Sequence, residues 1–204
     1  MKRKRTVQIS SNKNSLKYEK VSDTSSSRVM AFIIDWILSG ICAGIPSVIA
    51  YLILTGKSKP LTSMYQFGAA GLSREDTILI SIICILFGCF YYVVIPWKIF
   101  PGQTIGKKIT HLRIISTNDN KISLNTYFWR QFVFLILIEG AATPVSTYVK
   151  VIITTLTHFY VDSYLGLVWD VITLISVFIL FWGKNRMSLH DCFTKTVVIK
   201  MPIN

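Results

Sequence analysis

Long apolar stretches separated by short polar segments dominate the sequence. A helix needs about 20 mostly apolar residues to cross a bilayer. Residues 29–54, 77–98 and 164–183 meet this requirement, and each of these stretches carries a single charged residue. The pattern therefore predicts three transmembrane helices at these positions.

Residues 127–149 form a less regular fourth region. The chain is apolar from Phe132 to Ile138, is interrupted by Glu139, Gly140 and Pro144, and becomes apolar again after residue 150. We interpret this region as one kinked or tilted span that continues along the membrane interface to about residue 160. A re-entrant segment is the alternative.

The basic residues alternate between the polar segments. Lys and Arg number eight in residues 1–28, three in 55–76, six in 98–130, one in 140–163 and four from 183 onwards. Cytoplasmic loops of membrane proteins carry the excess of Lys and Arg. The alternation predicts four spans with both termini in the cytoplasm, preceded by a disordered basic tail over residues 1–27, with the membrane domain covering 28–204.

Composition agrees with a membrane protein. Charged residues make up 16% of the chain and the mean hydropathy is +0.50, whereas soluble domains have about 25% charged residues. The net charge is +12, and the Lys and Arg residues lie in the polar segments between apolar stretches. A nucleic-acid-binding protein would instead carry a basic face on a water-soluble domain, so we expect no nucleic-acid partner. The four cysteines lack paired spacing, and we expect neither a cofactor nor a metal site.

Two β-branched segments interrupt the helical pattern. KKITHLRIIS and KISL flank the turn sequence at residues 117–120, which predicts a short β-hairpin at the cytoplasmic surface. The run TKTVVIK, residues 194–200, would add a third strand. Irregular interfacial loops are the alternative. The expected fold class is an all-α membrane protein with this hairpin.

Arg28, Ala31 and Asp35 are spaced to share one helix face. Arg28 would lie at the inner interface and Asp35 two turns deeper. An ionised Asp at a helix centre costs about 2.5–3.5 kcal/mol on insertion scales, so this carboxylate must face protein or water. It either exchanges an ion or holds neighbouring helices together.

Glu139 and Asp170 also lie in apolar segments. Together with Asp35 they would place carboxylates at stepped depths, as in a proton or cation path. The alternatives are an interfacial position for Glu139, and for Asp170 a partner such as Arg130 or a hydroxyl group.

The segment PGQTIGKKI, from Pro101, superficially resembles a phosphate-binding loop. Its glycine spacing is too short and Lys108 stands where a hydroxyl residue is required. We expect the segment to turn the chain off the membrane, with Lys107 and Lys108 facing anionic headgroups.

SLHDCF, from Ser188, has the spacing of a capping box that opens a short helix. His190 is a candidate gate or pH sensor because imidazole exchanges its proton near neutral pH. The sequence contains no combination of residues typical of a hydrolase or metalloenzyme, so we expect no enzyme.

These motifs together resemble the RDD family of bacterial membrane proteins, named for one arginine and two aspartates. The arginine and first aspartate correspond to Arg28 and Asp35, and the second aspartate to Asp191. The loop motif corresponds to Gly102, Gln103, Thr104, Gly106 and Lys107, and Thr196 fits the ending of the family pattern. Glu139 and Asp170 have no counterpart in that motif.

The resemblance implies a multi-pass protein of the bacterial cell membrane, and it raises the expectation of transport. We consider a cation/proton antiporter in which Asp35 exchanges the ion, with Arg28, Asp191, Glu139 and Asp170 as further pathway candidates. One four-helix chain hardly encloses such a path, so this function requires a homo-oligomer or a membrane partner subunit. The alternative is a non-transporting accessory, assembly or immunity-type protein.

Overall fold

A computed structural model describes residues 25–56, 63–117, 122–183 and 187–201 of the chain. The protein is mostly helical. Among its described elements, Phe90–Ile99 (η1) and Phe128–Ile138 (η2) are π-helical, and Gly140–Ala142 (η3) is a 3-10 turn. In chain order the elements are α1 Ser25–Thr55, α2 Gln66–Ala69, α3 Arg74–Cys89, η1 Phe90–Ile99, α4 Ile105–Ile109, β1 Leu112–Ser116, α5 Leu124–Tyr127, η2 Phe128–Ile138, η3 Gly140–Ala142, α6 Ser146–Thr157, α7 Asp162–Trp182, α8 Leu189–Thr194 and β2 Thr196–Lys200.

Three helices among the described residues are long and apolar enough to cross a membrane. They run over Ser26–Thr55, Arg74–Ile99 and Asp162–Trp182, close to the three uninterrupted spans predicted from sequence. The second begins at Ser73, whose hydroxyl caps the helix by accepting from the Asp76 backbone N–H at 3.0 Å. Many of their large apolar side chains point outward, as expected for helices whose surroundings are lipid.

The fourth predicted region is not one continuous helix. Its first piece, Leu124–Ile138, is shorter than a full span. The chain then leaves the helix at Glu139, makes the short turn η3 and resumes as α6. The break falls at the predicted position, and Ser146 satisfies part of the freed backbone. Its hydroxyl donates to the carbonyls of Gly140 at 2.5 Å and Thr143 at 2.7 Å.

The two strands come from distant parts of the chain. β1 pairs with β2 in antiparallel register, from Leu112 opposite Lys200 to Ser116 opposite Thr196. The predicted local hairpin is therefore wrong. Within its second arm, KISL, Ser123 instead caps α5 by accepting from the Thr126 backbone N–H at 3.2 Å. The run proposed as a third strand is the true partner.

Burial explains this pairing. Leu112, Ile114 and Val198 on one face of the sheet are buried against Ala31 of α1 and Tyr127 of α5. A local hairpin would give β1 a partner but would leave the C-terminal apolar run uncovered. Pairing the two runs with each other buries both.

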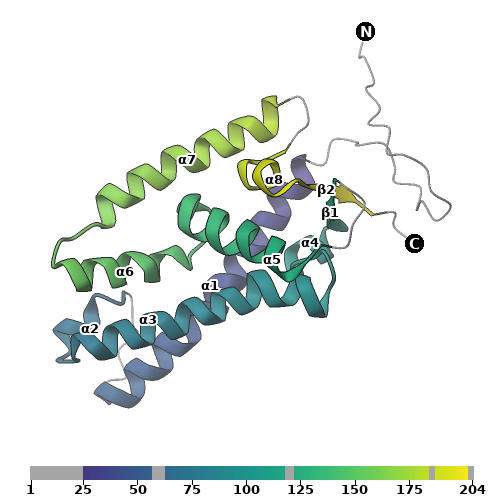
Figure 1. The fold of residues 1–204 in the computed structure, drawn as a ribbon. Helices are drawn as coiled ribbons and strands as arrows, with labels where there is room; N and C mark the ends of the chain where they lie inside the picture. The colour runs from purple at the N-terminus through teal and green to yellow at the C-terminus, as the bar shows by residue number, and fades with distance from the viewer. Residues whose placement is uncertain (1–24, 57–62, 118–121, 184–186, 202–204) are drawn as a thin grey trace, which may run out of the picture.

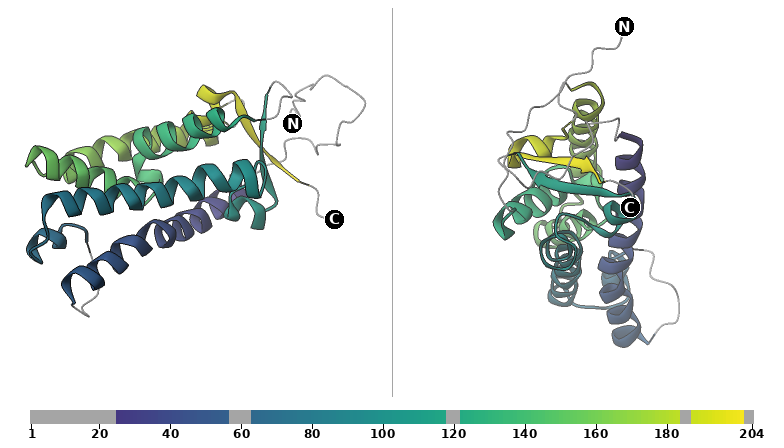
Figure 2. Two further views of the ribbon diagram at one scale, coloured as in Figure 1. Left: turned by 60° about the horizontal axis from the view of Figure 1, so that its bottom comes forward. Right: turned by 90° about the vertical axis from the view of Figure 1, so that its right-hand side faces the viewer.

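The sheet, α4, α8 and the start of α1 gather at one end of the helical bundle (Figure 1). We call this the sheet end, and the opposite end, where α6 meets α7 and where α2 lies, the far end. The long helices run between the two ends (Figure 2). Three segments are rich in Lys and Arg: residues 1–28, residues 98–130 and the residues from 183 onwards. The described parts of all three therefore lie at the sheet end.

Candidate functional site

Asp35 lies on the inner face of α1 and is only 3% exposed. Its carboxylate accepts hydrogen bonds from the Tyr91 hydroxyl at 2.7 Å, the Thr104 hydroxyl at 2.5 Å and the Gly106 backbone N–H at 2.8 Å. Lys107 adds an ion pair at 3.2 Å. Four donors therefore satisfy this carboxylate inside the protein.

The loop motif is what brings these donors to α1. Thr104 is the N-cap of α4, and Gly106 lies in its first turn. A Cβ on Gly106 would lie 2.4 Å from the Ala31 carbonyl oxygen and 2.8 Å from Cγ of Asp35. Glycine at 106 and alanine at 31 thus let α4 contact α1 closely enough for its backbone to bind Asp35.

Two other motif residues connect the loop to the sheet. Gly102 adopts a positive φ of 87° and accepts a hydrogen bond from the Ile114 backbone N–H at 2.7 Å. The Gln103 side chain donates to the Leu112 carbonyl at 2.7 Å. The motif therefore joins α1, α4 and β1 into one unit.

Lys107 and Lys108 do not both extend toward lipid headgroups as the sequence suggested. Lys107 turns inward to Asp35, and burial lowers the pKa of its ammonium group although Asp35 acts to raise it. The ammonium of Lys108 lies 3.4 Å from the ring centroid of Phe100.

Asp191 is fully buried in α8 and holds two arginines. Arg28 of α1 pairs with one carboxylate oxygen, and Arg130 of η2 donates to the other at 2.5 Å. Ser188 is the N-cap of α8, and Asp191 completes the predicted capping box, with the Ser188 hydroxyl donating to it at 2.8 Å. Burial acts to raise the pKa of Asp191, but Arg130 and Arg28 hold it well below its usual range.

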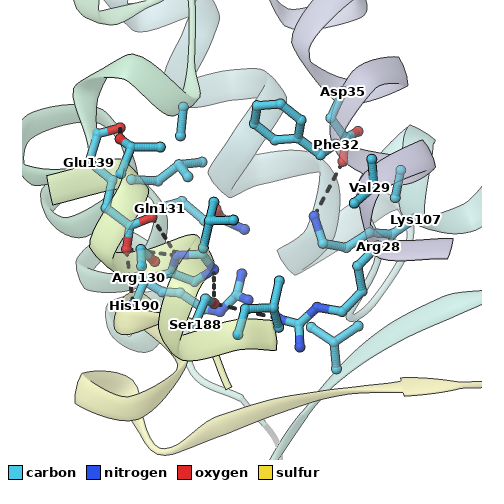
Figure 3. A pocket seen from close by; sticks show the side chains of 18 of the residues that line it. Arg28, Val29, Phe32, Asp35, Lys107, Arg130, Gln131, Glu139, Ser188 and His190 are labelled. Carbon is cyan, nitrogen blue, oxygen red and sulfur yellow. Dashed lines mark hydrogen bonds and ion pairs between the residues drawn. The ribbon is translucent and has the colours of Figure 1, made fainter. Parts of the chain in front are cut away.

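Glu139 is bound to His190. The His190 backbone N–H donates to Glu139 at 3.1 Å, and its ring Nδ1 lies 3.1 Å from both carboxylate oxygens. The other ring nitrogen, Nε2, lies 2.9 Å from the Ser188 hydroxyl. Hydrogen bonds therefore run from Glu139 through His190 and Ser188 to Asp191, as Figure 3 shows in part.

Two cavities lie on either side of the break in the fourth predicted region. The sheet-end cavity, about 180 Å³, lies between α1 and α7 and includes Asp35, Glu139 and His190 in its lining. The far-end cavity, about 490 Å³, lies between the break and the α6–α7 half of the bundle. Its polar lining includes Asp170 and the ion pair of Lys150 with Asp162, at 2.9 Å.

The predicted pathway residues are thus divided. Arg28, Asp35, Glu139 and His190 line the sheet-end cavity, and Asp191 lies directly behind it. Asp170 is exposed and lines the far-end cavity. The suggested pairing of Asp170 with Arg130 is replaced by that of Arg130 with Asp191.

The sequence model of the RDD family matches residues 24–195. The chain belongs to the RDD family. Searches of the curated proteins and of the solved structures found no match to it. In this RDD protein the arginine and second aspartate form an ion pair, Arg28 with Asp191, across 163 positions of sequence. The first aspartate, Asp35, instead binds the loop motif.

Sequence reasoning missed three residues of the site: Tyr91, Arg130 as a partner of Asp191, and Gln131. Arg130 was the most detectable, since an arginine flanked by apolar residues needs a buried partner. Among the described residues there is no cluster of three or more His, Cys, Asp or Glu that is suited to a metal ion.

Proposed function

We propose that this RDD protein is a bacterial cell-membrane transporter that exchanges protons for a cation. Glu139 and His190 carry the proton. In this proposal the interrupted region 124–157 completes a fourth crossing, and both termini lie in the cytoplasm. The observation that supports it best is the pair of cavities on opposite sides of one short break.

The break itself forms the partition between the cavities. Glu139 and Ala142 line the sheet-end cavity, whereas the intervening Gly140 and Ala141 line the far-end cavity. Trp169 closes the partition from α7, with its indole N–H donating to the Leu137 carbonyl at 3.0 Å. A Cβ on Gly140 would lie 2.2 Å from the Trp169 ring, so the ring lies directly against the backbone.

A small rearrangement at this partition would move Glu139 from one cavity to the other. Glu139 is the C-cap of η2: its backbone N–H makes the last helical hydrogen bond, to the Phe134 carbonyl at 2.7 Å, and the chain turns away directly after it. His190 Nδ1 accepts or donates the proton on the sheet side. The chain of groups from His190 through Ser188 gives the proton a route toward the sheet end.

Asp35 has a different role in this proposal from the one first expected. Four donors surround the Asp35 carboxylate and use its acceptor positions. Releasing it for ion exchange would leave Lys107 without its ion pair and three further donors without their acceptor inside the protein. We therefore assign exchange to Glu139 and assign Asp35 to joining α1 to α4.

Na⁺- or Li⁺-driven pH change in everted membrane vesicles tests this assignment. Glu139→Gln should abolish the pH change, because the amide neither binds nor releases a proton in this range. Asp170→Asn is the matched control, an exposed carboxylate of the far-end cavity, and should retain most of the exchange. All rates are normalised to the folded protein in the membrane. A Glu139→Gln protein that exchanges at the wild-type rate would refute the proposal.

The second candidate is a non-transporting accessory protein that acts by binding a membrane partner. The ion pairs of Asp35 and Asp191 favour it, because both carboxylates already bind cationic side chains of the same protein. Purification in mild detergent separates the two functions. A stoichiometric foreign subunit together with absent exchange favours the accessory role, whereas a homo-oligomer with exchange favours transport.

A further inference from the structure

Gln131 is a buried side chain with an unused hydrogen-bond donor. It lies in η2, is 1% exposed and lines the sheet-end cavity. Its amide Nε2 has no hydrogen-bond partner among the described residues. A buried amide without a partner costs about 1–3 kcal/mol, so the geometry points to a hydrogen-bond acceptor that occupies this cavity.

The charges near Gln131 restrict what this acceptor is. Arg28, Lys107 and Arg130 line the same cavity, and the carboxylates beside them are already occupied: Asp35 by four donors and Glu139 by His190. The Lys107 ammonium donates to Asp35 at 3.2 Å and to Thr104 at 3.3 Å, and an ammonium group has three N–H donors. The cavity thus offers donors to its occupant, which suits an anionic oxygen.

The walls of the cavity are apolar and lead to the surface. Val29 and Phe32 of α1 face Val177 and Phe181 of α7 across it, and each of these four side chains is about 40% exposed. Neither α1 nor α7 is among the other's main packing neighbours. Figure 3 shows the labelled polar side chains that line the cavity, among them Lys107, Gln131 and Glu139. The inner part of the cavity therefore carries polar groups, and its lateral opening between α1 and α7 is apolar.

We propose that the sheet-end cavity binds the phosphate group of a membrane phospholipid, whose acyl chains leave between α1 and α7. Gln131 Nε2 and Lys107 donate to the phosphate oxygens, and Val29, Phe32, Val177 and Phe181 contact the chains. The position fits such a lipid, because Arg28 at the start of α1 lies at the level where headgroups are expected. Lipid binding is a property of the cavity that the exchange proposal does not require.

Native mass spectrometry of the full-length protein in detergent tests this proposal. Phosphatidylglycerol is titrated against diacylglycerol with the same acyl chains, which lacks the phosphate. We expect phosphatidylglycerol to bind at least tenfold more tightly. Inorganic phosphate forms a third arm, and it should compete only weakly because it has no chains. Equal binding of both lipids, or inorganic phosphate binding as tightly as the lipid, would overturn the proposal.

Gln131→Leu tests the amide directly. Since the Nε2 donor is unpaired in the protein alone, replacing the amide with an apolar group of similar size should change the melting temperature little. Phosphatidylglycerol affinity should fall roughly tenfold, as expected for one lost hydrogen bond to a charged group. Unchanged affinity in this variant would contradict the assignment of Gln131.

A second pair of variants tests the lateral opening. Val177→Trp fills the space between α1 and α7 and should weaken phosphatidylglycerol binding. Leu174→Trp is the matched control on the same helix, at a side chain that is 68% exposed and outside the cavity lining, and should bind as wild type. Equal binding by both variants would place the lipid elsewhere. Gln131→Leu, which has no assigned role in exchange, should keep the vesicle pH change while it loses lipid affinity, so the two proposals fail independently.

Discussion

At the residue scale, Asp191 balances the charge of the sheet end. Two buried guanidinium groups, from Arg28 and Arg130, share this one carboxylate, and Arg130 also donates to the Thr196 hydroxyl at 3.1 Å. Removing one member of a buried ion pair leaves the other charge uncompensated. Asp191 therefore stabilises the junction of α1, η2, α8 and β2.

Asp191→Asn should lower the free energy of unfolding by about 3 kcal/mol, because the amide keeps an acceptor but loses the charge. The measurement is the thermal melting of the purified protein in detergent at pH 7. Asp170→Asn, at an exposed carboxylate, should melt close to wild type.

The same variant has a defined pH dependence. The pKa of Asp191 is lower in the folded protein than its unfolded value of about 3.9. The charged form therefore stabilises the fold above about pH 4, and this stability is lost as the pH falls through the folded-state pKa. The gap in melting temperature between wild type and Asp191→Asn should narrow below about pH 4. A gap that stays constant to pH 3 would contradict the assignment.

Sequence spacing predicted some parts of this site and missed others for physical reasons. The common face of Arg28, Ala31 and Asp35 follows from helix periodicity, and the capping box of Ser188 and Asp191 is a local pattern. Which carboxylate each cation meets depends on packing between segments far apart in the chain. That is why Lys107 pairs with Asp35, and Arg28 with Asp191, without a local signal.

At the element scale, α4 and the strands depend on contacts across the chain. The β-branched runs were recognised correctly, but strand propensity does not name a partner. The turn sequence at residues 117–120 favoured the neighbouring run, whereas burial of Leu112, Ile114 and Val198 against α1 favours the distant one. The break at Glu139 was predictable because Gly140 and Pro144 mark it in the sequence.

Gly106→Ala should disrupt the approach of α4 to α1. Its Cβ would meet backbone at 2.4 Å, and overpacking of this kind costs about 1–3 kcal/mol. We expect a lower melting temperature, because the hydrogen bond from the backbone N–H of residue 106 to Asp35 would weaken. Gly166→Ala is the matched control in α7, where an added Cβ meets nothing within 4 Å, and it should be neutral or up to about 1 kcal/mol more stable. Equal melting of the two variants would refute the close contact.

At the scale of the whole molecule, the two ends of the bundle differ in charge and structure. The sheet end holds α4, α8, both strands and most of the described basic residues, while the far end holds the turns around α2 and between α6 and α7. This asymmetry agrees with the loop charges in the sequence, which favour a cytoplasmic sheet end.

Labelling with a membrane-impermeant maleimide checks this orientation. Cys192 is exposed at the sheet end, so it should react in everted vesicles but not in intact cells. Ser163→Cys, in a Cys192→Ser background, places a thiol at an exposed far-end position and should react in intact cells. The reverse pattern would invert the orientation, and labelling of both in intact cells would place the ends on one side.

The pairing of Arg28 with Asp191 also has a consequence for biosynthesis. The ribosome makes Arg28 163 residues before Asp191, a delay on the order of ten seconds at bacterial rates of synthesis. During that time α1, α3 and α7 must enter the membrane while the two arginines still lack their carboxylate. The alternation of loop charges in the sequence predicts that this basic end stays in the cytoplasm. α8 and β2 are made after these helices and only then join the first helix, so this contact forms late in synthesis.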